Sequence, residues 1–597
     1  MIKDFTFIRY EKRTGWQRFF IYGFLFMELL PYVKTGYVGD DILNSLIKGA
    51  CVNRSLPFFE ILVSYILYGM KRGRCFFLAE ILCYAIHYFI SDRVVYKLLI
   101  AALTLLSVRV AEKLICYHFQ TEDTAGLFLI LCAAFFPIFY TGSNSLMMYH
   151  GFMQTEVILF FGSIYLLEKY LQEHRRKYLF WSVLIYSCSL FTYEISYVFI
   201  LGIAVVCYSK GAHEDHKILK YYIISFCIGI TITIVCRYLS ANYFADGLYD
   251  GVEVSISNFG KVVKTFCIQF LGGVSFFHYF VDGANGGYLK EVSVAGIFSA
   301  CLFLAVTSGY LRRRKKESLA NGQGCDEKVF IILGCLLWFG STGLIAVTEK
   351  YQRELLVSLH PHIPAYIEYF GMILLVFCAC THLLNTTKTY AKRKYYVYGF
   401  VILAGCMNHY LGMAHIKNYV KQTEAIYANM PDAYAQAIEN GLLDQIDASD
   451  TIIIDISYAP VIYENLFAFY AKKPVKAERM DRFIADIDKN KIVNDRYEPQ
   501  NTYITKYFES EDQTVVYLDK VKSIRFDEEQ VNITGIKTSS ISAWCKSRKE
   551  IEGLYTMQNG QAQIVSLRDC FCNKGREDYY IQTPEALYDY DSYTFWQ

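Results

Sequence analysis

Long apolar runs recur through the first two thirds of the chain and are separated by short polar segments. A helix needs roughly 20 apolar residues to cross a bilayer. This spacing predicts about eleven membrane-spanning helices, uncertain by one or two. The predicted spans lie near residues 16–33, 96–116, 125–141, 155–171, 178–191, 194–208, 219–240, 292–311, 328–347, 365–384 and 396–413.

Two shorter apolar runs, residues 58–68 and 76–90, follow the first predicted span. Lys71, Arg72 and Arg74 separate them, and short apolar runs beside basic residues are typical of helices that lie in the headgroup layer. We therefore expect interfacial helices within a first outer loop that extends from residue 34 to about residue 97. If both runs were spans instead, the orientation of the later helices would be unchanged.

Basic clusters give the orientation. With a cytoplasmic amino terminus, the clusters at 173–177, 210–220, 312–316 and 392–394 all fall on the cytoplasmic side, as the positive-inside rule requires. The first apolar run ends without a small-residue cleavage site, which indicates a retained signal anchor. The sequence thus predicts a multi-pass protein of the plasma membrane.

The composition changes after residue 415, where apolar runs shorten and Asp and Glu occur throughout. We expect a transmembrane domain over 1–415 and a soluble extracytoplasmic domain over 416–597. Residues 451–456, 514–518 and 562–567 are typical of strands and 433–440 of a helix, which predicts an α+β domain. No motif in this domain indicates catalysis.

The overall composition excludes several classes of protein. The sequence is 54% hydrophobic, 17% aromatic and only 19% charged, which is not typical of a soluble protein. The net charge of +2 gives no reason to expect nucleic acid as a partner. Most of the 19 cysteines fall in apolar runs, and their spacing indicates neither a zinc site nor a disulfide framework.

Asp40 and Asp41 form an acidic pair directly after the first predicted span. Ionisable groups that a membrane protein holds against the bilayer often mark a functional site. One carboxylate can accept a proton from an acceptor hydroxyl, while the other orients that hydroxyl or binds a divalent metal. The alternative is a helix cap, because Asp at the start of DILNSLIKG satisfies free backbone N–H groups.

The layout around this pair resembles the GT-C superfamily of membrane glycosyltransferases, which includes protein O-mannosyltransferases, aminoarabinose transferases and oligosaccharyltransferases. The segments GDDILNSLIKGA and GRCFFLAEILCYAIHYF are similar in order and spacing to the family's acidic pair and interfacial helices. The next two segments, YKLLIAALTLLSVRVAEKLI and GLFLILCAAFFPIFYTGSN, look like the family's following two spans. The resemblance covers roughly residues 10–413 and lies in the architecture more than in motifs.

The resemblance implies a second acidic group in the next outer loop, where the chain offers Glu156 with His150 and Gln154 nearby. The Leu-Asp-Met and Asp-x-Asp strings of the family are absent, so a divalent metal, Mg²⁺ or Mn²⁺, stays open. Glu156 can equally mark the start of a helix. Glu194, in a tight turn between two predicted spans, either lines the cavity or makes a helix-terminal hydrogen bond.

The resemblance also implies an Arg that holds the donor phosphate, and Arg353 in the last outer loop matches that position. A planar guanidinium suits a departing phosphate because it offers positive charge and paired N–H donors. Lys350, His360 and His362 share the loop and are expected to assist. As an alternative, Lys350 and Arg353 anchor the chain at the membrane interface.

These observations favour an inverting glycosyltransferase that moves a sugar from a polyprenyl-phosphate carrier to a cell-envelope glycan or polymer on the outer face of a bacterial membrane. Three alternatives remain open. They are a transporter or flippase of lipid-linked saccharide, a polysaccharide polymerase or ligase, and a non-enzymatic envelope assembly protein.

Overall fold

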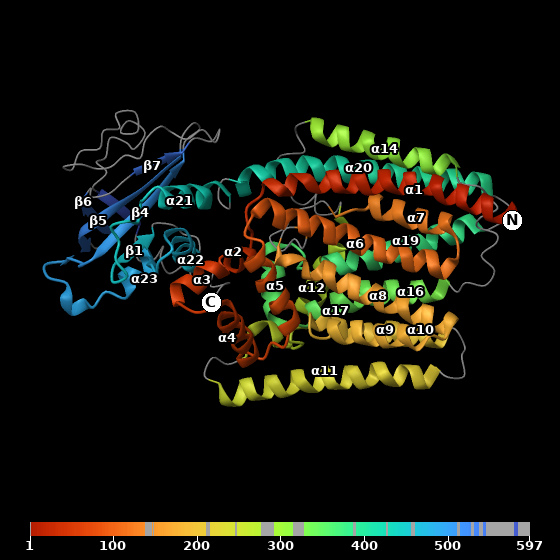
Figure 1. The fold of residues 1–597 in the computed structure, drawn as a ribbon, viewed down its shortest axis with the longest axis horizontal. Coiled ribbons are helices and arrows are strands. Elements are labelled where there is room, and N and C mark those ends of the chain that lie inside the picture. Colours follow the sequence, from red (N-terminus) through yellow and green to blue (C-terminus); the bar gives the residue numbers. More distant parts are fainter. Residues whose placement is uncertain are drawn as a thin grey trace. The chain divides into compact units, whose positions relative to one another are not determined.

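The structure is a computed structural model, and Figure 1 shows its fold. It describes residues 2–137, 146, 148–209, 215–244, 248–275, 292–313, 327–385, 390–424, 428–454, 460–509, 514–526, 530–536, 541–544 and 578–582. The chain divides into two compact units. The first comprises Met1–Asp41 and Val63–Gln422, and the second comprises Ile42–Leu62 and Thr423–Gln597.

The first unit is a bundle of helices. Its longer helices are α1 (Ile2–Leu29), α6 (Arg93–Phe119), α7 (Glu122–Ala134), α8 (Phe152–Glu173), α9 (Arg176–Ser189), α10 (Phe199–Ser209), α11 (Asp215–Tyr243), α14 (Val294–Arg313), α16 (Glu327–Cys335), α19 (Ala365–Asn385) and α20 (Tyr390–Glu424). A π-turn (Leu336–Gly340) joins α16 to α17 (Ser341–Ala346). Helix α6 packs against α7 and α8, α19 packs against α7 and α16, and α11 packs against α9 and α10.

Six described helices are long and apolar enough to cross a membrane, so the chain is a multi-pass helical membrane protein. These are Arg93–Phe119, Lys217–Tyr243, Val294–Leu311, Glu327–Ala346, Ala365–Leu384 and Arg393–Lys417. The five other predicted spans coincide with α1, α7, α8, α9 and α10, which are helical as expected. Their crossing of the membrane, and hence the total of eleven, stays a prediction.

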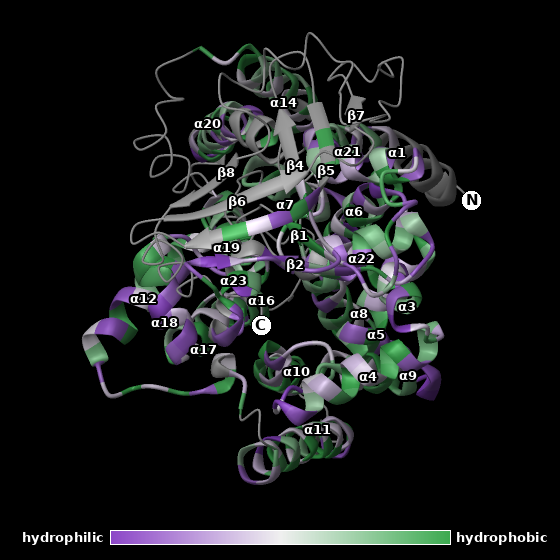
Figure 2. Cartoon of the chain, turned by 90° about the vertical axis from the view of Figure 1, so that its left-hand side faces the viewer, coloured by the Kyte–Doolittle hydropathy of each residue, from purple (hydrophilic) through white to green (hydrophobic). Residues whose placement is uncertain are grey.

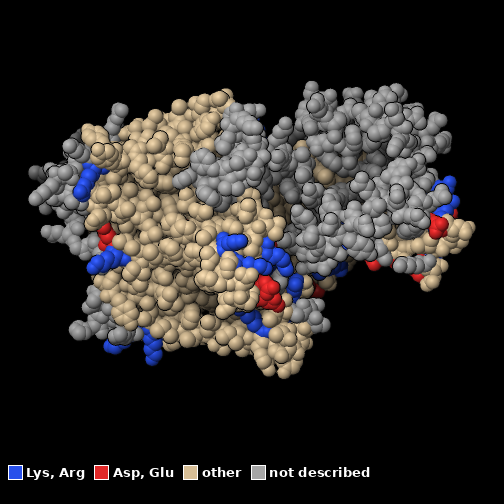
Figure 3. Space-filling view, turned by 180° about the vertical axis from the view of Figure 1, so that it is seen from behind, with Lys and Arg blue, Asp and Glu red and all other residues tan. Residues whose placement is uncertain are grey.

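The surface of the bundle is largely apolar. Helix α11 exposes large side chains along its length, among them Ile224, Ile228 and Ile234. Figure 2 shows hydrophobic positions along α10 and α11, whereas α12 (Phe259–Gly272) and α18 (Glu349–Ser358) mix hydrophobic with hydrophilic ones. On the face drawn in Figure 3, most of the described surface carries no charged residue. Such a surface suits contact with lipid.

The first predicted outer loop contains four short helices: α2 (Asp40–Ser45), α3 (Ile47–Arg54), α4 (Phe58–Lys71) and α5 (Phe77–Phe89). Helices α3 and α4 meet at an angle of 105°, and α5 has 13 residues. Short helices are thus present where the sequence predicts them. Their location in the headgroup layer stays a prediction.

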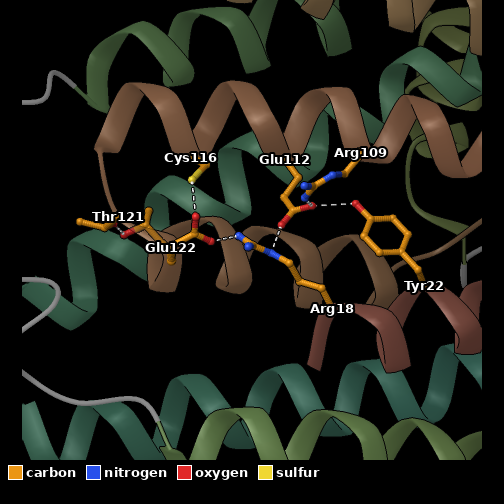
Figure 4. Close-up of polar contacts among 8 residues, drawn as sticks. Arg18, Tyr22, Arg109, Glu112, Cys116, Thr121 and Glu122 are labelled. Carbon is orange, nitrogen blue, oxygen red and sulfur yellow. Dashed lines mark hydrogen bonds and ion pairs between the residues drawn. The ribbon is translucent and has the colours of Figure 1, made fainter. Parts of the chain in front are cut away.

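A buried ionic network joins α1, α6 and α7 (Figure 4). Glu112 of α6 is fully buried, and its carboxylate accepts hydrogen bonds from Arg18 Nε at 2.5 Å, Tyr22 Oη at 2.8 Å and Arg109 Nη1 at 2.5 Å. Arg18 also pairs with Glu122 at the start of α7. A buried carboxylate is tolerated when it is paired and hydrogen-bonded in this way.

Helix α7 ends inside the bundle, and side chains from other helices satisfy its last carbonyl groups. An α-helix leaves its final carbonyls without an intrahelical partner, which is costly where water is absent. The hydrogen bonds are Tyr369 Oη to Cys132 O at 2.6 Å, His409 Nε2 to Ala133 O at 2.9 Å, Ser275 Oγ to Phe135 O at 3.3 Å and Asn408 Nδ2 to Phe136 O at 2.9 Å. These caps fix the point at which α7 gives way to Pro137.

The second unit contains a mixed sheet with the strand order β2-β1-β4-β5-β6-β8, and β3 and β7 also pair with β5. The strands are β1 (Thr451–Ile454), β2 (Lys476–Arg479), β3 (Arg496–Tyr497), β4 (Thr502–Glu509), β5 (Thr514–Phe526), β6 (Gln530–Ile536), β7 (Ile541–Trp544) and β8 (Asp578–Gln582). Strand β1 runs parallel to β2 and β4, and the other pairs are antiparallel.

The helices of this unit are α21 (Met430–Glu439), α22 (Pro460–Ala471) and α23 (Met480–Ala485). The expected strands at 451–456 and 514–518 and the expected helix at 433–440 therefore coincide with β1, β5 and α21. The expected strand at 562–567 lies outside the described residues. Composition predicts a division at residue 415, but residues 42–62 also belong to the second unit. Side chains of this segment pack on the apolar core of that unit, which hydropathy does not reveal.

Candidate functional site

Asp41 is buried at the start of α2, and three other elements of the first unit contact its carboxylate. Tyr96 Oη, from α6, donates a hydrogen bond to Oδ2. The backbone N–H of His150 donates to Oδ1 at 3.1 Å, and His87 Nε2, from α5, lies 3.7 Å from the same oxygen. The side chain is therefore held in one orientation.

The turn that presents the His150 N–H has unusual backbone geometry. Tyr149, His150 and Gly151 have φ values of 66°, 43° and 73°. Non-glycine residues rarely adopt this left-handed conformation, and its energetic cost is typical of functional sites. The His150 ring is buried and stacks on Phe152 at 5.5 Å between ring centroids. The turn directs the His150 N–H to the Asp41 carboxylate.

Asp40 and Asp41 differ in electrostatics. Burial raises the pKa of Asp40 to about 7, against the charges of Arg74 and Lys350, while the charge of Asp41 adds to the rise. Burial also disfavours ionised Asp41, but interaction with His87 and the charges of Lys97 and His150 outweigh it and lower the pKa of Asp41 below its usual value. Near neutral pH, Asp41 is ionised, whereas Asp40 can take up or release a proton.

Two cations lie close enough to affect Asp40, and both also contact Tyr249. The Arg74 guanidinium lies 4.8 Å and Lys350 Nζ 4.5 Å from the centre of the Tyr249 ring. Arg72 lies 5.6 Å from the same ring centre. Asp40 thus has concentrated positive charge beside it, which suits an anionic group on a substrate.

The members of the predicted phosphate-binding set differ in exposure. Lys350 is largely buried and lies 3.8 Å from Glu354, whose other carboxylate oxygen lies 3.9 Å from His362 Nε2. Burial, with the charge of Lys350, lowers the pKa of His362 to about 3, so this ring is neutral. Arg353 is exposed and His360 is half-buried on the same segment. Lys350 is the member of the set that acts on Asp40.

Glu156 and Glu194 are the candidates for a second acidic group. Glu156 is fully buried, four residues after the start of α8. Glu194 forms an ion pair with Arg237 of α11. The charge of Arg74 acts on Glu194 as well as on Asp40.

Four side chains of this region are not among the site residues that the sequence predicts: His87, Tyr96, Arg74 and Tyr249. The sequence does give an indication for His87. It is a lone ionisable residue on an apolar helix, and such residues usually pair with another polar group. Arg74 stands next to a predicted interfacial helix, where a basic residue is ordinarily taken for an anchor. Within the described ranges, no group of three or more His, Cys, Asp or Glu side chains is arranged to hold a metal ion.

No protein-family model matches the sequence, and no curated protein matches it. Among solved structures, the chain is similar to a crystal structure of ArnT from Cupriavidus metallidurans bound to undecaprenyl phosphate. The identity is 12% and the TM-score is 0.33, over 82% of this chain and 93% of that chain. A similarity at this level carries no conclusion about activity, so the function is argued from the site itself.

Proposed function

We propose that this chain is a GT-C-like inverting glycosyltransferase, which moves a sugar from a polyprenyl-phosphate carrier to a cell-envelope glycan or polymer on the outer face of the membrane. The observation that carries the proposal is the acidic pair. Asp40 has a pKa of about 7, because of its burial, next to a firmly held Asp41 and two cations. A general base works best when its pKa lies near the operating pH.

In the proposed reaction, Asp40 takes the proton of the acceptor hydroxyl as the oxygen attacks C1 of the sugar. The bond between C1 and the carrier phosphate oxygen breaks, and the phosphate leaves with the electron pair. Asp41, fixed by Tyr96 and the His150 N–H, orients the acceptor. The His150 ring is proposed to supply a further hydrogen-bonding group beside Asp41.

Arg74 and Lys350 are proposed to stabilise the departing phosphate, since both act on Asp40 and so lie near the reacting atoms. Arg353 and His360, on the same segment as Lys350, are proposed to hold outer parts of the donor phosphate. Glu156 and Glu194 remain candidates for the second acidic group. A divalent metal would add to the positive charge that these cations supply.

A transporter or flippase of lipid-linked saccharide is the second candidate. The observation that favours it is the presence of buried ionisable pairs inside the bundle, where such groups often mark transport pathways. His409 Nδ1 lies 3.0 Å from Glu28 Oε2, and His118 Nδ1 lies 2.6 Å from Glu168 Oε1.

The deciding experiment replaces Asp40 and Asp41 by Asn, singly and together, in the purified full chain. Release of polyprenyl phosphate from a polyprenyl-phosphate sugar is then followed. We expect the double variant to lose roughly 10²–10⁴-fold in transfer rate at unchanged abundance in the membrane. Asp486→Asn, at an exposed position of the second unit, is the matched control.

If the double variant transfers the sugar as fast as the unchanged chain does, the acidic pair is not the catalytic group. Movement of the lipid-linked sugar across vesicle membranes, with no transfer by any form of the chain, would favour the transporter.

A further inference from the structure

Helix α12, which belongs to the first unit, packs against α17, α18 and α19 of the same unit (Figure 2). Its Phe270 ring stacks on the Trp338 ring at 4.3 Å between ring centroids, and Trp338 Nε1 donates a hydrogen bond to Phe270 O at 2.8 Å. A Cβ atom added to Gly272 would lie 2.6 Å from Pro361 Cβ. The end of α12 is therefore in direct contact with the segment that precedes α19.

Gln269, near the end of α12, is buried and makes three hydrogen bonds with its side-chain amide. The Oε1 atom accepts the His362 N–H at 2.7 Å. The Nε2 atom donates to His362 O at 3.3 Å and to Glu368 Oε1 at 3.0 Å. A flipped amide would set two N–H groups against a donor and its oxygen against two acceptors, so these contacts permit one orientation. Gln269 thus holds both backbone polar groups of His362.

Glu368, in the first turn of α19, contacts the same amide from the other side. It is fully buried, and its Oε1 atom also lies 3.0 Å from Thr342 Oγ1 of α17. Among the residues that the structure describes, Glu368 Oε2 has no hydrogen-bond partner. A carboxyl group is costly to bury. Its described hydrogen bonds are to Gln269 and Thr342, so Glu368 fixes the amide of Gln269.

His362 in turn contacts α18, the helix that carries Lys350. The His362 ring lies 4.3 Å from the Tyr351 ring between centroids, and its Nε2 atom lies 3.9 Å from Glu354 Oε2. The other oxygen of Glu354 lies 3.8 Å from Lys350 Nζ, and both of these side chains are largely buried. A shift of His362 is therefore passed to Lys350 by direct packing.

We propose that Gln269 and Glu368 are positioning residues, which keep Lys350 beside Asp40 by holding His362 against α18. This inference rests on the proposed function, in which Lys350 stabilises the departing phosphate. It gives α12 a role in the rate of transfer although α12 contributes no group to the reaction. Misplacement of a catalytic group by about 1 Å is enough to reduce the rate on the order of 10²-fold.

The test compares Gln269→Leu with Trp338→Phe in full-length purified protein. Gln269→Leu removes all three hydrogen bonds of the amide and releases His362. Trp338→Phe is the matched control, because it removes the bond to Phe270 O and weakens the attachment of α12 without touching His362. Gln269→Leu is expected to lower kcat roughly tenfold or more with donor KM little changed, and Trp338→Phe to leave both nearly unchanged.

The pH profile of kcat is a readout that a merely structural role would not move. The charges that act on Asp40 are those of Arg74, Asp41 and Lys350, and the charge of Lys350 lowers the pKa of Asp40. Displacement of Lys350 should therefore raise this pKa and move the acid limb to higher pH in Gln269→Leu alone. A lower kcat with an unmoved acid limb, or an equal shift in Trp338→Phe, would overturn the proposal.

An exchange of the two side chains tests the proposal if Gln269→Leu does not fold. Gln269→Glu alone sets two carboxyl groups against each other and should lower kcat. The double variant Gln269→Glu/Glu368→Gln restores an amide–carboxyl pair and keeps an acceptor for the His362 N–H, so it should recover part of the lost rate. A double variant that shows the product of the two single losses would contradict the pairing.

Chemical labelling of Lys350 separates this inference from the proposed function. The rate at which an amine-reactive reagent modifies Lys350 is measured by mass spectrometry. Gln269→Leu should raise that rate several-fold over the unchanged chain and over Trp338→Phe, whether or not the chain transfers a sugar. Absence of transfer by the unchanged chain would refute the proposed function alone. Unchanged labelling of Lys350 in Gln269→Leu would refute the positioning role alone.

Discussion

Asp40 and Asp41 are adjacent in the chain, yet their carboxylates have different surroundings. Asp41 accepts hydrogen bonds from Tyr96 and the His150 N–H, whereas Asp40 Oδ1 is buried without a hydrogen-bond partner. Burial therefore dominates at Asp40, and specific partners dominate at Asp41. The sequence leaves open which residue is the base, and this difference favours Asp40 because its pKa lies near neutrality.

The pKa of Asp40 predicts a pH-dependent gain in stability for Asp40→Asn. The folded chain retains a proton at Asp40 up to about pH 7, whereas the ordinary value is 3.8, so the folded state loses stability as pH rises through that window. Asn carries no such penalty. Thermal unfolding in detergent should give equal stability near pH 4 and a more stable variant at pH 8, by on the order of 1–4 kcal/mol.

Asp41→Asn is the matched control and should have the opposite sign. The lowered pKa of Asp41 contributes stability that is present above its ordinary value and is lost as pH falls through the lowered value. Its replacement should therefore destabilise the chain at pH 8. Equal pH dependence of the two variants would contradict the assignment.

The cations of α18 and its surroundings provide a second residue-scale prediction. Lys350→Gln and Arg74→Gln should each reduce the transfer rate on the order of 10²-fold, because each removes a charge that acts near the departing phosphate. Arg353 is exposed, so Arg353→Gln should change the rate less than tenfold. Steady-state kinetics with purified lipid-linked sugar would distinguish them. A larger loss in Arg353→Gln than in Lys350→Gln would restore Arg353 as the principal phosphate ligand.

At the scale of elements, the apolar runs predict which segments are helical, while tertiary contacts decide where the helices end. The predicted span near 125–141 has the pattern of one continuous helix, but α7 ends at Ala134, where side chains of α19 and α20 satisfy its carbonyls. Hydropathy cannot reveal those partners, because Tyr369, Asn408 and His409 are distant in sequence. The same limit explains why His87, from a different helix, is found beside Asp41 only in the folded chain.

The capping of α7 predicts a cost for removing Asn408. Asn408→Leu leaves the Phe136 carbonyl without its hydrogen bond in a water-free environment, which typically costs about 1–3 kcal/mol. Asn242→Leu is the control, because Asn242 makes a similar bond to the Tyr238 carbonyl at an exposed position. Thermal unfolding should separate the two variants. Equal stability would show that α7 does not depend on this cap.

At the scale of the whole molecule, hydropathy predicts a division near residue 415, whereas the second compact unit comprises both Ile42–Leu62 and Thr423–Gln597. Hydropathy cannot predict that Ile42–Leu62 belongs to the second unit, because the apolar residues of this segment pack on protein and not on lipid. Ile42, Leu43 and Leu46 pack on the core of the second unit, whereas the hydropathy of an isolated segment suggests contact with the lipid interface. The hydropathy of a short segment does not show whether its apolar side chains contact a protein core or lipid.

The predicted count of spans determines the side of the membrane on which the second unit lies. Eleven spans are an odd number, so residues 416–597 should lie opposite the amino terminus, and the basic clusters at 312–316 and 392–394 should be cytoplasmic. Reporters fused after residues 120, 316 and 430 test this arrangement. The first two should report the cytoplasm and the third the outside. A cytoplasmic report from residue 430 would require an even number of spans, and it would contradict the prediction that residues 416–597 form an extracytoplasmic domain.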